Sequence, residues 1–568
     1  MKLFELFTNK APTKVFLSML LGIVAGISYA LLIPVVLVSI GSRIDQNTAS
    51  SEMTRTFLTF EVSNYKFALL FVSICIFILI CRTTSHVLLT RVALDATTDL
   101  RIKTYRRIMN APIAELEKMG SSKLLVAITT DVTRIIIGAT VVPNVLVNLV
   151  TIAGMLGYLF LLSADVFWFT VGAIVFGVVT YQIPMYIGSR YFQKGRSKMD
   201  MLQESIRGLI HGTKELKLSK VKRDRYFNEV LLANEYDVLN NSKTANTIVS
   251  AAANYGDLLS FFVIGVVAYI FVSYHAISTE ALVGAIMSLL YVTGPVANIL
   301  FSMVPLSNAK ISYRNMRQVF DALSKEPANE EIQTLPEWDS IRFSNVTYRY
   351  DDSDNSFVLG PVDLEFAKGE ITFIVGGNGS GKSTLCKLMA LHYSPTAGEI
   401  HFGNVKIEPQ SLNSGRQYIS AIFSDYYLFD RLLGGLSEVD ENLVNRYLTK
   451  LEIQRKVSVK DGKFSTLALS DGQKKRLALV VAFLEDRDIY LFDEWAADQD
   501  PVFKQFFYRN IVPELKARNK AVVVISHDDR YFDVADQVLF MEEGKLIRTE
   551  RPGWEVKEPL VTATNSVA

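Results

Sequence analysis

Cysteine, histidine and tryptophan are scarce in this chain of 568 residues, which contains 3 cysteines, 6 histidines and 4 tryptophans. Cys75 and Cys81 lie in one apolar run and Cys386 lies far from both, so the spacing supports neither a disulfide framework nor a cysteine-based metal site. The chain also has almost no net charge, +1 at pH 7, and no acidic or basic tail. The composition therefore gives no support for nucleic-acid binding.

Apolar residues are abundant instead, and the mean hydropathy of +0.23 exceeds that of most soluble proteins. A helix needs about 20 largely apolar residues to cross a bilayer. Six stretches meet this length, at about residues 15–40, 66–90, 136–162, 166–187, 250–273 and 281–304. The first is longer than the apolar core of a signal peptide, so it should stay as a membrane helix. The sequence predicts six spans; the alternative is a soluble protein with unusually long buried helices.

The connections between these spans differ in positive charge. Lysine and arginine cluster after the second span, from Arg91 to Lys123, and after the fourth span, from Arg190 to Arg225. The loops near Ser163 and His275–Ser278 are short and nearly free of both. Because Lys and Arg in short flanks favour the cytoplasmic side, we expect the basic connections and both termini to be cytoplasmic.

Both basic connections carry apolar residues at helical spacing, so we expect them to extend the membrane helices inward. Each pattern is interrupted near its tip, by Pro112 in the first connection and by residues Gly208–Gly212 in the second. Proline and glycine commonly end helices. A short crosswise helix is therefore predicted at each tip.

The pattern changes after the sixth span. A helix-type segment leads into an acidic, proline-containing linker at 325–338, and short β-type runs then alternate with helical ones over 339–555. Such alternation is typical of an α/β domain, whereas residues 556–568 lack periodicity and are expected to form a mobile tail. The predicted fold class is a multidomain membrane protein: a six-helix transmembrane domain, residues 1–324, followed by an α/β domain with a P-loop.

The segment ITFIVGGNGSGKSTLCKLMA, Ile371–Ala390, joins a strand-type run to a helix-type run through a glycine-rich loop. Glycines let backbone N–H groups converge on phosphates, and the N-terminus of the following helix favours anions. Lys382 is expected to reach the β- and γ-phosphates, and Ser383 to coordinate Mg²⁺. The pattern predicts a nucleotide site formed by Gly376, Gly377, Asn378, Gly379, Ser380, Gly381, Lys382, Ser383 and Thr384.

Two further motifs follow in the same domain. In DIYLFDEW, Asp493 closes an apolar strand and would hold Mg²⁺ through water, while Glu494 would orient or deprotonate an attacking water. In LSDGQ, Ser470 begins a helix-type run, where a serine serves as an N-cap and can also contact a ligand.

The motifs GGNGSGKS, LSDGQ, YLFDE and VISHD together resemble the nucleotide-binding domain of an ATP-binding-cassette (ABC) transporter. Six spans followed by one such domain resemble an exporter-type half-transporter, and the resemblance covers nearly the whole chain. It implies that the two crosswise helices are coupling helices, which bear on the ATPase domains. It also implies that Tyr350 stacks on adenine, that His527 holds the γ-phosphate, and that further ATP contacts come from Ser470, Gly472, Gln473 and Asp500.

The resemblance also bears on oligomeric state. A P-loop binds phosphates from one side only, and the helix N-terminus at Ser470–Gln473 can reach a γ-phosphate only from a facing surface. One chain has one surface of each kind, so a two-fold homodimer enclosing two ATP molecules is predicted. Because Glu494 and His527 are both present, we expect hydrolysis that drives alternating access.

Three positions depart from the family pattern. Ser424 replaces the Q-loop glutamine as a metal ligand, and because its side chain is shorter, either the loop shifts inward or Asp425 contributes through water. Asp471 replaces the first signature glycine and would repel phosphates unless it points away. Trp495 follows Glu494 where proline is more usual.

The expected function is ATP-driven export. The segments FSDYYLFD and LSDGQKKRLALVVAFLEDRDIYLFDEWAADQDP resemble the cyclic-peptide exporter family, which implies a siderophore precursor, lipopeptide or microcin-like peptide as cargo and the bacterial inner membrane as location. Only about fourteen residues precede the first span, so no N-terminal peptidase is expected. The alternatives are a lipid flippase, a multidrug exporter, and an ATP-gated channel or sensor.

The expected ligands are ATP, Mg²⁺ and a peptide-like small molecule, and the expected partners are a second copy of the chain and membrane lipid, with no nucleic acid. Within the spans, Asp257 is the acid expected to face a cavity and meet cationic cargo, because a carboxylate exposed to lipid is costly. The alternative for Asp257 is an ion pair with a neighbouring helix or a place near the inner headgroups. Arg82 and His86 are open to the same two interpretations.

Overall fold

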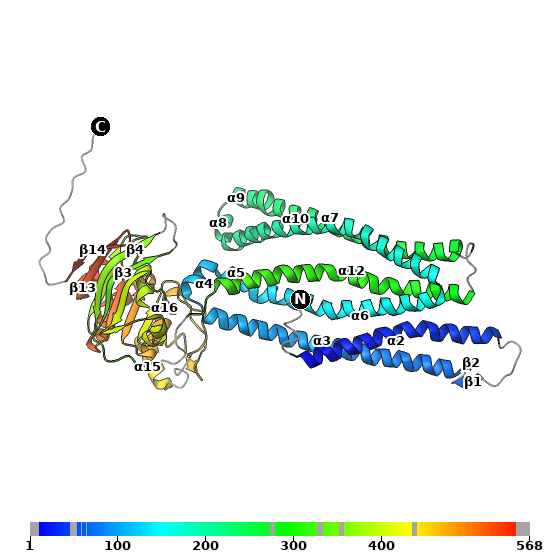
Figure 1. Cartoon of the computed structure of the whole chain (residues 1–568). Coiled ribbons are helices and arrows are strands. Elements are labelled where there is room, and N and C mark those ends of the chain that lie inside the picture. The colour runs from blue at the N-terminus through cyan, green and yellow to red at the C-terminus, as the bar shows by residue number, and fades with distance from the viewer. Residues whose placement is uncertain are drawn as a thin grey trace. The chain divides into compact units, whose positions relative to one another are not determined.

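The computed structural model describes residues 11–45, 54–57, 60–63, 65–271, 273, 279–326, 333–350, 357–433 and 440–551. Two compact units make up the chain (Figure 1): one contains Ser122–Asp321 and the residues up to Arg106, and the other contains Arg107–Ser121 and the residues from Ala322 onward. The loop at His275–Ser278, much of the linker predicted at 325–338, and the predicted tail at 556–568 lie outside the described residues.

The first unit consists mainly of long helices, and six of the described helices are long and apolar enough to cross a membrane, which confirms the predicted six spans. A short hairpin of β1 (Thr54–Phe57) and β2 (Phe60–Ser63) lies between the first two. The helical elements are α2 (Pro12–Asp45), α3 (Tyr65–Met109), α5 (Ser121–Val126), η1 (Ala127–Asp131), α6 (Val132–Leu162), α7 (Ala164–His211), α8 (Thr213–Lys217), α9 (Lys220–Arg225), η2 (Tyr226–Leu231), α10 (Leu232–Gly265), η3 (Val266–Phe271) and α12 (Thr279–Ala322).

Small residues bring these helices into close contact. A Cβ atom added to Gly138 of α6 would lie 2.1 Å from Cβ of Ala309 on α12, and one added to Gly22 of α2 would lie 2.5 Å from Cγ2 of Val147 on α6. Apolar side chains gain little from leaving lipid for a protein interior, so close backbone approach is a principal way to stabilise packed membrane helices. These glycines therefore fix the positions of α2, α6 and α12.

The second unit contains a six-stranded sheet of order β14-β13-β5-β12-β11-β8, parallel except for the β13–β14 pair, and a four-stranded antiparallel sheet of order β4-β3-β6-β7. The strands are β3 (Ser340–Arg349), β4 (Val358–Ala367), β5 (Ile371–Gly376), β6 (Ala397–Phe402), β7 (Val405–Lys406), β8 (Ile419–Ile422), β11 (Ile489–Asp493), β12 (Ala521–Ile525), β13 (Gln537–Glu542) and β14 (Lys545–Glu550), with a separate hairpin of β9 (Val459–Lys460) and β10 (Lys463–Phe464).

The helices of this unit are α4 (Ile113–Met119), α13 (Lys382–Met389), α14 (Leu412–Arg416), α15 (Glu441–Lys450), α16 (Asp471–Glu485), α17 (Pro501–Phe506), η7 (Phe507–Ile511) and α18 (Val512–Ala517). Strands β5, β11 and β12 are fully or largely buried, as expected for parallel strands covered on both faces. Because the carboxyl ends of parallel strands share one edge, the residues after β5, β11 and β12 gather there.

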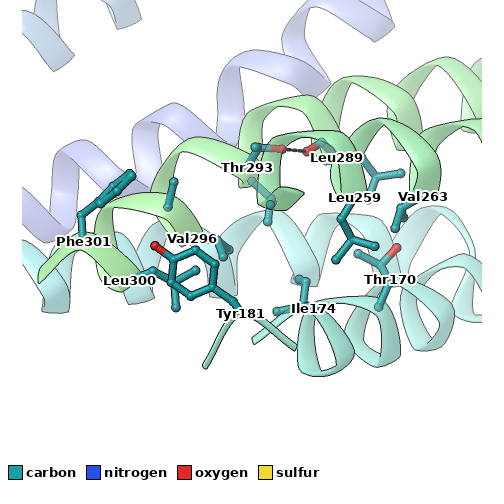
Figure 2. A pocket seen from close by; sticks show the side chains of 15 residues that line it. Thr170, Ile174, Tyr181, Leu259, Val263, Leu289, Thr293, Val296, Leu300 and Phe301 are labelled. Carbon is teal, nitrogen blue, oxygen red and sulfur yellow. Dashed lines mark hydrogen bonds between the residues drawn. The ribbon is translucent and has the colours of Figure 1, made fainter. Parts of the chain in front are cut away.

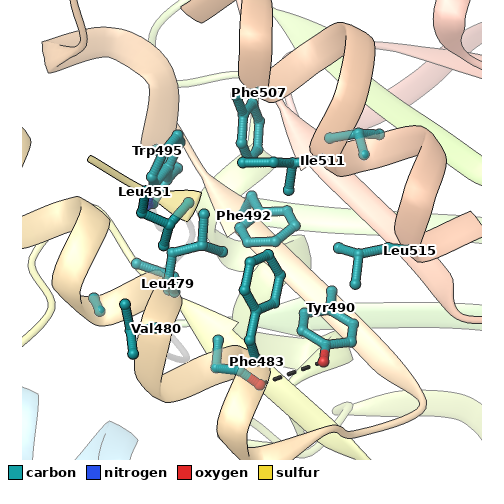
Figure 3. Packing of buried hydrophobic residues seen from close by; sticks show 14 of the residues in the cluster. Leu451, Leu479, Val480, Phe483, Tyr490, Phe492, Trp495, Phe507, Ile511 and Leu515 are labelled. Carbon is teal, nitrogen blue, oxygen red and sulfur yellow. Dashed lines mark hydrogen bonds between the residues drawn. The ribbon is translucent and has the colours of Figure 1, made fainter. Parts of the chain in front are cut away.

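An aromatic cluster packs around strand β11 of this sheet (Figure 3). Phe492 of β11 packs edge-on against Phe507, with ring centroids 5.2 Å apart, and Trp495 stacks on Phe507 at 4.3 Å. Tyr490 is also buried, and its hydroxyl donates to the carbonyl of Ala482 on α16 at 3.3 Å. The strand that ends at the predicted catalytic pair is thus anchored to both α16 and η7.

Candidate nucleotide site and membrane cavity

The P-loop connects β5 to α13 as its sequence predicts. Gly379 and Gly381 have φ values of 79° and 98°, a left-handed region that glycine enters without steric cost. The ammonium of Lys382 donates to the carbonyls of Gly376 and Gly377 at 2.8 and 2.9 Å. The buried hydroxyl of Ser380 has no hydrogen-bond partner among the described residues. The loop thus holds an unpaired polar group and a cation suited to phosphate oxygens.

Burial sets the electrostatics of this loop. It lowers the pKa of Lys382, although the carboxylates of Glu494 and Asp493 act in the opposite direction. Burial also raises the pKa of Asp493, and the neighbouring charge of Glu494 adds to that rise. A cation and a carboxylate that are both partly desolvated are stabilised when oppositely charged ligands arrive. The site is therefore suited to a phosphate chain together with a divalent cation.

Oxygen donors for such a cation lie around Asp493. Ser424 donates a hydrogen bond of 3.4 Å to Oδ2 of Asp493, and Ser383 is the exposed second residue of α13. Mg²⁺ prefers oxygen ligands, keeps several waters and commonly takes only one or two protein ligands at a phosphate site. The donor set present fits Mg²⁺, with Ser383 and Asp493 as the residues that would hold it and Ser424 beside them.

Glu494 and His527 face each other at the ends of neighbouring strands. Nε2 of His527 lies 3.2 Å from Oε1 of Glu494, because β11 and β12 are parallel and in register up to Asp493 and Ile525. Glu494 has a left-handed φ of 49°, which turns the chain directly after the strand. The two side chains predicted to carry hydrolysis are therefore brought into direct contact.

Trp495 has a structural place that explains its departure from the family pattern. It is 1% exposed, stacks on Phe507, and donates from Nε1 to the carbonyl of Lys475 on α16 at 2.9 Å. Nζ of Lys475 in turn donates to the carbonyl of Glu494 at 3.1 Å. The tryptophan thus ties the turn that carries Glu494 to the helix that begins at the LSDGQ motif.

The LSDGQ motif forms the N-terminus of α16 with a complete capping box. Oγ of Ser470 accepts from the backbone N–H of Gln473 at 3.4 Å, and Oε1 of Gln473 accepts from the backbone N–H of Ser470 at 3.2 Å. The side chain of Asp471 is 84% exposed and pairs with Lys474 at 3.2 Å. The aspartate in the glycine position therefore points into solvent, where Lys474 offsets its charge.

Gly472 and Asp500 belong to the same region. The carbonyl of Gly472 accepts from Nε2 of Gln499 at 3.0 Å, and a Cβ at Gly472 would lie 2.9 Å from the carbonyl oxygen of Asp498. Asp500 caps α17 and pairs with Arg476 of α16 at 2.6 Å. Among the described residues, no hydrogen bond or ion pair joins Ser470, Gly472, Gln473 or Asp500 to the P-loop. One chain thus presents two separate groups of predicted ATP contacts.

Tyr350 lies beyond β3 and is partly exposed. Its hydroxyl is 2.9 Å from Oγ1 of Thr384 on α13, and its ring meets those of Tyr348 and Tyr393 edge-on, at 5.2 and 5.8 Å. Tyr348 and Tyr393 are themselves stacked at 4.6 Å. The aromatic residue predicted to stack on adenine is thus one of a group of three tyrosines beside the P-loop helix.

The short helix α4, which Pro112 precedes, packs within this second unit. Glu117 of α4 accepts from Lys387 of α13 at 2.8 Å and from the hydroxyl of Tyr393, and Glu115 accepts from the backbone N–H of Ser324 at 2.7 Å. Sequence reasoning predicted the helix but missed Lys387 and Tyr393, because nothing local relates positions about 270 residues from Glu117. The sequence hinted at these partners only through the acidic Glu117, which stands on an otherwise basic connection.

The membrane unit contains an apolar cavity of about 130 Å³ between α7, α10 and α12 (Figure 2). Its walls include Ile174, Leu259 and Val296. The hydroxyl of Thr170 is bonded within its own helix, whereas the hydroxyl of Tyr181, a residue 3% exposed, has no partner among the described residues. Because this hydroxyl is buried, the surface that the cavity presents is mainly apolar. The side chain of Asp257 lies outside the described residues, so its predicted role stays a prediction.

Comparisons with known proteins agree with this geometry. Residues 359–497 match the ABC transporter domain family, and residues 15–296 match the ABC transporter transmembrane region. The chain is a multi-pass membrane protein with an ATP-binding domain, and it belongs to the ABC exporters. It is similar to the ATP-binding protein SyrD of Pseudomonas syringae pv. syringae, with 32% identity over 84% of this chain and 87% of that protein.

Two further comparisons are more distant. The lactococcin-A transport/processing ATP-binding protein LcnC of Lactococcus lactis subsp. lactis is 24% identical over 66% of this chain and 54% of its own length. Among solved structures, a bacterial Atm1-family ABC exporter with ATP bound has a TM-score of 0.74 and 17% identity, covering 96% of this chain and 95% of that one. At this identity the structural likeness shows the fold alone.

Proposed function

We propose that this protein is a homodimeric exporter that uses ATP hydrolysis to carry a cyclic or otherwise modified peptide out of the cytoplasm. The observation that supports the dimer most directly is the separation of the two groups of ATP contacts. The P-loop and the capped N-terminus of α16 have no bond to each other within the described chain, and each can complete the other only across two copies. ABC half-transporters in general work as dimers.

In the proposed cycle, ATP lies between Lys382 of one copy and Ser470 of the other. The N–H groups at the start of α16 then stabilise the γ-phosphate charge that the P-loop leaves open. Glu494 orients or deprotonates the attacking water, and His527, 3.2 Å from it, holds the γ-phosphate. Mg²⁺, held by Ser383 and Asp493, would neutralise charge on the phosphates. Loss of the γ-phosphate removes the contact that keeps the dimer closed.

The movement would reach the membrane helices through α4, and through α8 of the second basic connection. Glu117 links α4 directly to α13, the helix that begins at Lys382. A change in the position of α13 on ATP binding therefore acts on the connection that continues α3. The positive charge of the two basic connections supports an orientation with both termini and the ATPase domain in the cytoplasm of a bacterium and the spans in its inner membrane.

A peptide-like cargo is supported by the segments that resemble cyclic-peptide exporters and by the similarity to LcnC. The cavity between α7, α10 and α12 adds a chemical argument, since a dry apolar cavity of about 150 Å³ accommodates a benzene ring. A cavity of about 130 Å³ therefore suits one aromatic or branched aliphatic side chain.

A lipid flippase is the second candidate, because an acyl segment would also fill an apolar cavity. The two are separated by measuring the ATPase rate of the purified protein in nanodiscs of phosphatidylcholine, with added cyclic peptides, lipids or cationic drugs. Stimulation by cyclic peptides supports the proposal. Stimulation by lipids alone would overturn the peptide assignment, and stimulation by cationic drugs alone would indicate a multidrug exporter.

A further inference from the structure

Arg82 is a cation in the middle of the membrane helices. It lies within the second predicted span, 66–90, eight residues before its inner end, and it contacts Tyr29, which lies near the centre of the first span, 15–40. Nη1 of Arg82 donates to the hydroxyl of Tyr29 at 3.1 Å, and its guanidinium carbon lies 5.6 Å from the centre of the Tyr29 ring. Tyr291, near the centre of the sixth span, lies 5.5 Å from Tyr29 ring to ring.

The depth of Tyr29 shows that Arg82 does not extend to the inner headgroups. Fourteen residues separate Val15 from Tyr29, which is about 21 Å along a helix. An arginine that extended toward the cytoplasm would point down α3, toward Arg91. Arg82 instead bonds a side chain more than halfway across a hydrocarbon layer of about 30 Å. The charge is therefore held inside the hydrocarbon layer, away from the inner headgroups.

This charge is incompletely neutralised. A guanidinium has five N–H donors in a planar fork, and within the described residues Arg82 makes one hydrogen bond, to a neutral hydroxyl, and no ion pair with a carboxylate. A charge inside a membrane costs free energy unless it is paired, so an unpaired one marks a functional site. His86, one turn along α3 on the same face, is also exposed and adds a second nitrogen donor.

We propose that Arg82 binds an anionic group of the exported molecule, a carboxylate or a phosphate, through a paired N–H fork, with Tyr29 and Tyr291 lining the site. Arginine matches such planar or tetrahedral anions with two parallel hydrogen bonds. This inference rests on the proposed export function and names the chemical class of its cargo. The charge is opposite to the cationic cargo that Asp257 had led us to expect.

The apolar cavity lies close to this site on α12. Tyr291 is adjacent to Val292, which lines the cavity, and both pack in a cluster with Ile174 and Val296, which also line it. An anion at Arg82 and an apolar group in the cavity would thus be bound on two sides of one helix segment. The cargo that satisfies both sites is an amphiphile with a negative charge near an aromatic or aliphatic group.

An anionic lipid offers the same chemistry as an anionic cargo. The phosphate of a membrane lipid lies at the interface, however, whereas Arg82 is bonded to Tyr29 inside the hydrocarbon layer. A lipid headgroup would have to leave the interface to reach it. Depth therefore favours a transported molecule over a resident lipid as the source of the anion.

The test uses the full-length protein in phosphatidylcholine nanodiscs and two radiolabelled probes, N-dodecanoyl-phenylalanine and its carboxamide, which differ only in charge. We expect the wild type to bind the carboxylate at least about tenfold more tightly, as charge-assisted hydrogen bonds to arginine require. Arg82→Gln should erase the difference, and Arg82→Lys should keep part of it. Arg91→Gln, an exposed arginine of the same helix just beyond the inner end of the predicted span, is the matched control and should keep the full difference.

Equal affinities of the wild type for the two probes would overturn the proposal without any variant, and so would a preference that Arg82→Gln retains. Replacing part of the phosphatidylcholine with phosphatidylglycerol tests whether an anionic lipid occupies the site. If phosphatidylglycerol displaces the carboxylate probe, the assignment of the anion to the cargo is overturned. If the probe binds as tightly as before, that assignment is supported. ATPase stimulation by cyclic peptides is measured in the same nanodiscs. A stimulated wild type with equal probe affinities refutes the anion site alone and leaves the export function standing.

Discussion

Ser424 donates a hydrogen bond of 3.4 Å to Oδ2 of Asp493, the carboxylate proposed to hold Mg²⁺. A hydroxyl at the Q-loop position thus approaches the metal site although its side chain is shorter than that of glutamine. The long distance indicates a weak bond that can be exchanged for a metal or water ligand. Ser424 therefore lies beside the proposed metal site, joined to Asp493 by a weak hydrogen bond.

Mg²⁺ affinity should depend on this side chain. We expect Ser424→Ala to raise the Mg²⁺ concentration that gives half-maximal ATPase activity by about two- to tenfold, the loss of one neutral hydrogen-bonding group. Ser424→Gln should lower it, because the longer side chain reaches the metal. Ser420→Ala, a serine that bonds Glu485 instead, is the control and should leave it unchanged. An unaltered Mg²⁺ requirement in both Ser424 variants would remove Ser424 from the metal site.

Glu494→Gln should abolish hydrolysis while ATP binding persists. The amide keeps the shape of the side chain but cannot act as a base, so we expect a fall in turnover of about 10² to 10⁴-fold. The variant should accumulate as an ATP-bound dimer, measured by size-exclusion chromatography with light scattering and retained labelled ATP. ATPase activity equal to the wild type would contradict the role assigned to Glu494.

Glu117 should carry the coupling between ATP turnover and cargo. Glu117→Gln weakens the ion pair with Lys387 and the bond from Tyr393, so we expect normal basal ATPase activity with little stimulation by a cyclic peptide. Glu115→Gln, on the same short helix but bonded to Ser324, is the matched control. Full stimulation of Glu117→Gln would show that α4 transmits its movement through other contacts.

The pKa of Glu117 sets the pH range over which its contacts can support peptide stimulation of the ATPase. Burial alone would raise it, but the hydrogen bonds from Lys387 and Tyr393 outweigh burial, and the pKa lies below its ordinary value. A carboxyl whose pKa is lowered on folding stabilises the docked helix at neutral pH and loses that contribution only as pH falls through the lowered pKa. Peptide stimulation in the wild type should therefore stay constant between about pH 6 and 8 as far as Glu117 is concerned. Loss of peptide stimulation in the wild type between pH 8 and 6, with basal ATPase activity constant over the same range, would contradict it.

The sequence predicts local features well and tertiary partners poorly. Span length and the glycine-rich loop are properties of consecutive residues, so the six spans and the turn around Gly379 and Gly381 follow from the chain itself. The link from Glu117 to Tyr393, and the bond from Arg82 to Tyr29, join residues far apart in sequence. Asp257 was predicted to meet cargo because charged residues are rare inside membranes. Arg82 is rare for the same reason, and its contacts with Tyr29 support the anion site proposed for it.

Trp495 also shows that the sequence does not reveal tertiary partners. The sequence identifies this tryptophan as a departure from the family pattern, but only its packing in the structure explains why a tryptophan fits there. The indole stacks on Phe507 at 4.3 Å and donates to the carbonyl of Lys475 at 2.9 Å. It therefore holds the turn after β11 in contact with α16. A substitution there should affect the stability of the ATPase unit and, through that turn, the position of Glu494.

Trp495→Ala should destabilise this unit by about 3–5 kcal/mol, the usual cost of truncating a buried aromatic residue, and lower its melting temperature by about 10 °C. Unfolding is followed with a thiol-reactive dye in a Cys75→Ala, Cys81→Ala background, where the buried Cys386 is the remaining thiol. Trp495→Phe keeps a ring against Phe507 and loses the hydrogen bond, so its melting temperature should fall by only a few degrees, about 1 kcal/mol. Equal losses in the two variants would mean that the bond to Lys475, rather than the stack, holds the turn.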